Sequence, residues 1–80
     1  MVKYMPHYFF NIRGEGFEQT DMVGKRCANE VAALGEAMAI ASGIVQDRLA
    51  ALHVSHPGEV EVEDERHRTV LTLPLRAAAY

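Results

Sequence analysis

The sequence has one cysteine, no tryptophan and few aromatic residues outside a short N-terminal segment. Cys27 alone cannot form an internal disulfide or a zinc site built from several cysteines. The longest apolar stretch, residues 37–45, is far shorter than the roughly 20 residues that a membrane-spanning helix needs. Residues 1–7 contain no apolar segment of signal-peptide length. We therefore expect a cytoplasmic protein with no membrane segment, metal or cofactor.

Basic side chains are also scarce. Eight lysines and arginines face 11 aspartates and glutamates, which gives a formal net charge of −3. Nucleic-acid-binding domains are usually basic, so nucleic acid is not the expected partner. Eighty residues make one small domain, spanning residues 1–80, with a modest core. Because disulfides are excluded, self-association is the remaining way to stabilise it.

Five of the six aromatic residues lie between Tyr4 and Phe17. Residues 5–13 alternate between two faces, and their aromatic and β-branched content favours a β-strand. A glycine-containing turn at 13–16 ends it, and a short second strand is expected over 17–20. Residues 21–24 then predict a turn that aspartate and glycine stabilise. In the first strand, Tyr8, Phe10 and Ile12 should face the core, and His7, Phe9 and Asn11 the outside.

The middle of the chain predicts a long amphipathic helix. Asn29 is the expected N-cap, followed by Glu30 in the first turn. The helix is expected to run to about Leu52 and to end before residues 56–58. Gly35 and Gly43 should each cost about 1 kcal/mol relative to alanine. On a helical wheel one face gathers the large aliphatic residues and is expected to be buried: Val31, Leu34, Met38, Ala41, Ile44, Val45, Leu49 and Leu52.

The last third predicts a β-hairpin, with residues 64–67 as its connection. Val60 is expected opposite Leu71, and Glu63 opposite Arg68. Pro74 cannot donate to a neighbouring strand and indicates an edge. Residues 77–80 should be a frayed tail. The expected fold class is α+β: a mostly antiparallel sheet of three to four strands with one long helix on one face, in the order β-β-α-β-β.

Residues 5–13, Met-Pro-His-Tyr-Phe-Phe-Asn-Ile-Arg, resemble the opening of small bacterial proteins in the uncharacterised DUF6894 family, common in rhizobia and their relatives. The Asp-x-x-Gly turn at 21–24 and the alanine-rich helix start at 29–37 resemble the same pattern. Two features depart from it: Asn29 replaces the usual aspartate, and the final hairpin turn lacks the usual glycine. The resemblance implies the same fold, Met5 as the functional start with 1–4 as an extension, and no established activity.

Four candidate sites are better explained as structure. His53 and His56 supply at most half of a zinc site, and carboxylates on an alternating strand at 59–65 face solvent. Cys27 is expected to be a small buried residue rather than a nucleophile. Residues 14–16 lack the context of a phosphate-binding loop and predict only a turn. We therefore predict no catalytic, metal or cofactor-binding residues, no small-molecule ligand and no enzyme activity.

Two surfaces remain as candidates for interaction. Phe9 should point outward, where it could stack on RNA bases, lie in a sheet-mediated dimer or simply be partly exposed. Small residues spaced by four on the helix permit close approach of a second helix. The leading hypothesis is a non-enzymatic module that forms a homodimer or binds a protein partner; the alternative is a nucleic-acid-linked regulator such as an antitoxin-like component. The candidate surface residues are Phe9, Gly35, Ala39, Ile40 and Gly43.

Overall fold

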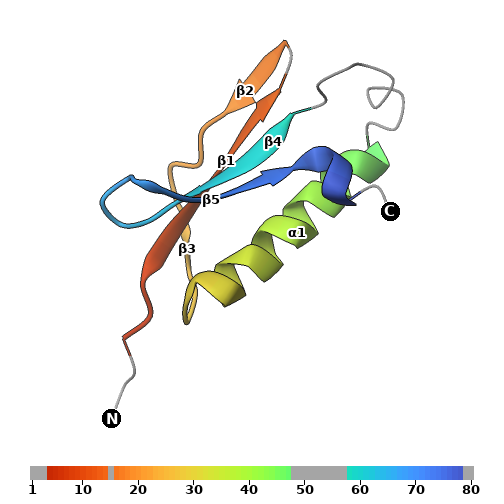
Figure 1. Cartoon of the computed structure of the whole chain (residues 1–80). Coiled ribbons are helices and arrows are strands. Elements are labelled where there is room, and N and C mark those ends of the chain that lie inside the picture. The colour runs from red at the N-terminus through yellow and green to blue at the C-terminus, as the bar shows by residue number, and fades with distance from the viewer. Residues whose placement is uncertain (1–3, 15, 48–57, 79–80) are drawn as a thin grey trace.

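The computed structural model describes residues 4–14, 16–47 and 58–78, and these form an antiparallel sheet with one helix on one face (Figure 1). The α+β class and the single long helix are confirmed. The sheet has five strands rather than three or four in this part of the chain. In chain order the elements are β1 (His7–Gly14), β2 (Phe17–Gln19), β3 (Lys25–Arg26), α1 (Glu30–Asp47), β4 (Glu59–Glu63), β5 (Thr69–Pro74) and the 3-10 helix η2 (Leu75–Ala78).

Strand β1 lies at the centre of the sheet, whose order is β2-β1-β4-β5. On one side it pairs with β4, with Phe10 opposite Val62. On its other side two short strands share the edge: β2 pairs with the end of β1, and β3 with its start. All of these pairings are antiparallel. The sheet therefore has β5 at one border and the β2 and β3 pair at the other.

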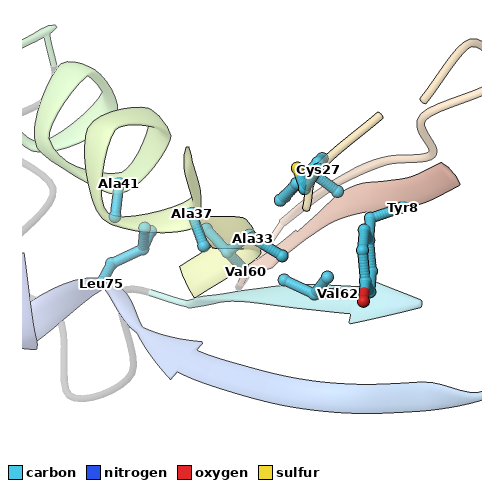
Figure 2. Close-up of a cluster of buried hydrophobic side chains, with 9 residues drawn as sticks. Tyr8, Cys27, Ala33, Ala37, Ala41, Val60, Val62 and Leu75 are labelled. Carbon is cyan, nitrogen blue, oxygen red and sulfur yellow. The ribbon is translucent and has the colours of Figure 1, made fainter. Parts of the chain in front are cut away.

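The predicted alternation along β1 is confirmed. Tyr8 and Phe10 are buried, and Ile12 is half-buried on the same face. Val60 and Val62 of β4 lie beside them and are fully buried. This face of the sheet forms the core under the helix (Figure 2).

The start of α1 also follows the prediction. The side-chain oxygen of Asn29 accepts the backbone N–H of Ala32 at 2.9 Å, which satisfies one of the free donors of the first helical turn. Glu30 is the first residue of α1 and lies at the positive end of the helix dipole. The helix continues to Asp47, and the part of its predicted length beyond that residue lies outside the described residues.

The face of α1 that contacts the sheet is not the predicted one. The buried stripe consists of Ala33, Ala37 and Ala41, each with an exposed fraction of 0%. Figure 2 shows Ala33 and Ala37 pointing toward β4, and Ala41 toward Leu75. Of the predicted face, Ala41 is buried and Ile44 packs against the core. The prediction was wrong for the large residues Val31, Leu34 and Met38, whose exposed fractions are 76%, 39% and 40%.

The bulk of the sheet residues explains this choice of face. Tyr8 and Phe10 of β1, with Leu75 of η2, already fill the space opposite the helix. Alanines opposite them let the helix axis come close, as a densely packed core requires. A helical wheel weights hydrophobicity and ignores the volume that the opposite layer supplies. It therefore selected the large residues over the small ones that fit.

The final hairpin has the predicted faces but a shifted register. Val60 lies opposite Leu73, not Leu71. Glu63 lies opposite Thr69, not Arg68, and a β-bulge separates the Val62 and Glu63 pairings. The connection is a turn in which His67 N–H donates to the Asp64 carbonyl, followed by His67 itself at φ +60°. This is the three-residue loop with a left-handed residue that glycine usually fills. The bulge and this loop together move the register by two residues.

The chain after β5 is more regular than the predicted frayed tail. Pro74 ends β5 at the border of the sheet, as expected for a residue without an N–H group. Leu75 begins η2 and is buried in the core, and its N–H donates to the Gly58 carbonyl at 2.9 Å. The helix η2 lies against α1 (Figure 1). Within the described residues, no helix is long and apolar enough to cross a membrane.

Candidate interaction surfaces

The turn at residues 21–24 connects β2 to β3 and is held by Asp21. One carboxylate oxygen of Asp21 accepts the N–H groups of Val23 and Gly24, and the other accepts the N–H of Phe10 on β1. The Asn11 side chain accepts the Asp21 N–H in return. Between β2 and β3, hydrogen bonds to the side chains of Asp21 and Asn11 thus replace the main-chain hydrogen bonds of the sheet. The predicted turn is confirmed, and its role extends to the edge of β1.

The protonation of Asp21 follows from these bonds. Partial burial raises the pKa of Asp21, but the N–H groups of Gly24, Phe10 and Val23 stabilise the charged form more strongly. The net effect is a pKa below the ordinary value. Asp21 is therefore a structural anion whose oxygens are occupied by the protein's own amides.

Phe9 lies on the outer face of the sheet between two histidines. Its ring is stacked on His7 with centroids 5.6 Å apart, and His67 covers it from the hairpin with centroids 4.8 Å apart. Gly24 closes the same cluster, since a Cβ there would lie 2.9 Å from the Phe9 ring. Phe9 is half-buried as a result. The ring is outward, as predicted, but its neighbours already occupy the positions where a base would stack.

The rest of the outer face is acidic and internally paired. Arg13 lies 3.2 Å from Glu61 and 3.9 Å from Glu18. In the hairpin, His67 lies 3.3 Å from Glu63, and Arg68 lies 3.4 Å from Asp64. The basic partners are exposed to water, which weakens the attraction, so these pairs contribute little to stability. Their arrangement matches a solvated surface, and none of these carboxylates is fully buried.

Cys27 is buried under the start of α1 (Figure 2). Burial raises the pKa of its thiol, and the charge of Glu36 adds to this, while Lys25 acts in the opposite direction. A raised pKa keeps the thiol protonated and a poor nucleophile. The interpretation of Cys27 as a small core residue is confirmed by its burial.

The predicted small-residue surface on α1 consists of Gly35, Ala39, Ile40 and Gly43, and the structure places Ile40 differently. Gly35, Ala39 and Gly43 are exposed, and a Cβ added at either glycine would meet no atom within 4 Å. Ile40 was expected beside them on the surface. It is instead partly buried and packs against the core, because it is adjacent to the alanine stripe on the helix.

A second helix surface was missed by the sequence reasoning. Val31, Leu34 and Met38 form an exposed apolar row at spacings of three and four residues, which we call the helix flank. Glu36, on the other side of the buried stripe, forms a 2.7 Å ion pair with Lys25 of β3. The signal that could have found this row is the i, i+4 repeat of Ala33, Ala37 and Ala41 opposite an aromatic strand.

The histidine pair His53 and His56 lies outside the described residues. Among the residues that the structure describes, no group of three or more histidine, cysteine or acidic side chains is placed to hold a metal ion.

Comparison with known proteins assigns a family but no activity. The family model described as "Domain of unknown function (DUF6894)" matches residues 7–76. No curated protein matches the chain, and no solved structure does.

Proposed function

The chain belongs to the DUF6894 family, whose function is unknown, and we propose that it is a non-enzymatic protein-interaction module of the cytoplasm. Its partner is a protein, either another copy of itself or a different chain. The helix flank is the surface that makes this contact.

The observation that carries the proposal is the exposure of Val31, Leu34 and Met38 beside a buried alanine stripe. Single exposed apolar residues are ordinary, but a contiguous apolar row on one element marks a contact surface. Methionine suits such a surface, because its flexible side chain adapts to the shape of a partner. The helix turns alanines toward the core and leaves Val31, Leu34 and Met38 at least partly exposed, which favours a role in binding.

A nucleic-acid-linked regulator is the alternative, and the described surface gives it less support. Phe9, the one aromatic side chain on the central strand's outer face, is covered by His7 and His67. The strand beside it carries Glu59, Glu61 and Glu63, whose charges repel phosphate. Base stacking on this face would require both the histidines and the acidic row to be displaced.

Site-specific photo-crosslinking in the cells that make the protein tests the proposal. A benzophenone amino acid placed at position 38 is expected to give protein adducts that disappear when Leu34→Lys is added. The same probe at position 39 lies on the other exposed side of α1 and is the matched control. Equal adducts from the two positions, or none from position 38, would show that the helix flank is not the binding surface.

A further inference from the structure

The two borders of the sheet differ in charge and in what lies beside them. The β2 and β3 border carries Glu18, Lys25 and Arg26. The β5 border, Thr-Val-Leu-Thr-Leu-Pro, carries no charge. Edge strands are ordinarily protected from pairing by charged side chains, by proline or by β-bulges. In β5 the bulge and Pro74 lie at the two ends, so the uncharged stretch between them is the unprotected part of this edge. Arg68, just before β5, is held by Asp64 at 3.4 Å.

The helix flank lies on the β5 side of the molecule. Successive residues of a helix are about 100° apart, so Glu36 and the pair Leu34 and Met38 lie on opposite sides of the buried alanine stripe. Glu36 reaches Lys25 on β3, at the other border of the sheet. Leu34 and Met38 must therefore lie toward β5, which also contacts α1 (Figure 1). An uncharged strand edge and an apolar helix surface are thus neighbours.

The outward groups of β5 follow from one hydrogen bond. Leu75 N–H points toward β4, where it donates to the Gly58 carbonyl. Main-chain groups alternate in direction along a strand, so Leu73 and Leu71 also point toward β4. Thr72 therefore presents its N–H and C=O outward, and Pro74 presents a carbonyl with no N–H. Among the described residues, β5 pairs only with β4, so these outward groups have no strand partner there.

From this arrangement we propose that the partner of the helix flank is a second copy of the chain, joined along β5. The inference rests on the proposed function and specifies its partner. Antiparallel pairing of β5 with itself about a two-fold axis continues the sheet and brings the two helix flanks together on one face. The outer face of β4 is acidic, so two copies stacked through their outer faces would repel each other, whereas pairing along the uncharged β5 edge avoids that contact.

The amount of surface that a dimer needs supports the use of both elements. A stable interface buries about 800 Å² on each partner. Three side chains of one helix, two of them already more than half buried, fall well short of that area. The adjoining β5 edge supplies main-chain hydrogen bonds and further apolar surface from Leu71 and Leu73, which are only partly buried. A contact through the helix alone would leave the interface too small.

Sedimentation equilibrium combined with amide hydrogen exchange tests the dimer. The full chain is expected to dimerise, and Leu34→Lys with Met38→Lys should raise the dimer dissociation constant at least about thirtyfold. Ala39→Lys, on the opposite exposed side of α1, should leave it unchanged. The Thr72 amide should exchange slowly in the dimer and fast in the double variant, whose circular dichroism should match that of the parent.

The outcomes separate this inference from the proposed function. A strict monomer at high micromolar concentration overturns the dimer, while adducts from position 38 to another protein would still uphold an interaction module. A dimer that Ala39→Lys breaks and the double variant leaves intact overturns the helix flank as the contact surface in both proposals, because the contact then uses the small-residue surface. A dimer with a fast-exchanging Thr72 amide keeps the helix flank and overturns pairing through β5.

Discussion

The carboxylate of Asp21 accepts the backbone N–H of Phe10 at 3.1 Å, and so bonds the middle of the central strand from a turn eleven residues away. The same side chain holds the N–H groups of Val23 and Gly24. One aspartate therefore holds both the β2–β3 turn and the side of β1 that faces β2 and β3. The aspartate of the Asp-x-x-Gly pattern thus has a structural role in this chain.

Replacement of Asp21 should be costly and should change the response to acid. Asp21→Ala leaves the Phe10 amide without its partner, and we expect a loss of about 2 kcal/mol in the free energy of unfolding at neutral pH. The folded pKa of Asp21 is below its ordinary value of 3.8, so its contribution is complete above that value and falls as the pH drops through the folded pKa.

Urea unfolding of the parent and of Asp21→Asn at several pH values measures this. The stability difference between the two should be largest at neutral pH and should shrink as the pH falls below 3.8. A difference that stays constant down to strongly acidic pH would mean that the Asp21 charge is not the source. Asp64 also has a lowered pKa, through the Arg68 and Arg66 amides, and it titrates in both proteins and so cancels.

His67 should be more replaceable by glycine than by alanine. Its φ of +60° is a left-handed conformation that costs an ordinary residue about 1–2 kcal/mol. Both replacements lose the contact with Phe9, but only glycine also removes the strain. We expect His67→Gly to be about 1 kcal/mol more stable than His67→Ala in chemical denaturation. If the two variants were equally stable, the left-handed conformation of His67 would not be strained.

Gly16 and Gly24, two of the three described glycines at positive φ, provide a matched pair. A Cβ at Gly16 meets nothing within 4 Å, while one at Gly24 would lie 2.5 Å from His7 and 2.9 Å from the Tyr8 carbonyl. Gly16→Ala should therefore cost only the backbone strain, about 1 kcal/mol. Gly24→Ala should cost clearly more, because the outer cluster around Phe9 must move. Thermal unfolding of both variants compares them, and equal losses would contradict the close approach.

The alanine stripe should tolerate no enlargement. Ala37→Leu pushes a larger side chain against the sheet, and overpacking of this kind costs about 1–3 kcal/mol. Ala39→Leu, two residues along on an exposed side of α1, should change stability by less than about 0.5 kcal/mol. Chemical denaturation of the pair tests which face of the helix is buried. A tolerated Ala37→Leu with a damaging Ala39→Leu would reverse the orientation of α1.

Cys27 should react only after unfolding. Burial raises the pKa of its thiol and keeps reagents away from it. The rate of modification by a disulfide reagent at mildly alkaline pH should be slow for the folded chain and fast in denaturant. Fast reaction of the folded protein would reopen a chemical role for this residue.

Local chemistry accounts for what could be predicted from the sequence. The alternation at Tyr8 and Phe10, the Asn29 cap and the Asp21 turn each depend on a few neighbouring residues, and all three are present as expected. The inward face of α1 depends instead on how much volume the sheet supplies. Leu34 is more apolar than Ala37, so a wheel favours it, yet only the smaller residue fits beneath β4.

The predictions of the hairpin register and of the inward face of α1 failed for related reasons. A left-handed His67 and a bulge beside Glu63 are not visible as a turn signal, because glycine is absent from the loop. Once the helix was rotated in the prediction, the flank of Leu34 and Met38 was assigned to the core and could not be considered as a surface. Ile40 was assigned outward by the same error.

The pairing of Phe10 with Val62 joins residues 52 positions apart in the chain, since 62 − 10 = 52. Closing so long a segment has an entropic cost that the short β1–β2 and β4–β5 turns do not have. The β1–β2 and β4–β5 hairpins should therefore form early and the β1–β4 pairing last, which gives slow folding for so small a protein. During synthesis, β1 would wait with one border unpaired until β4 has left the ribosome, a period in which a newly made chain is most exposed to misassembly.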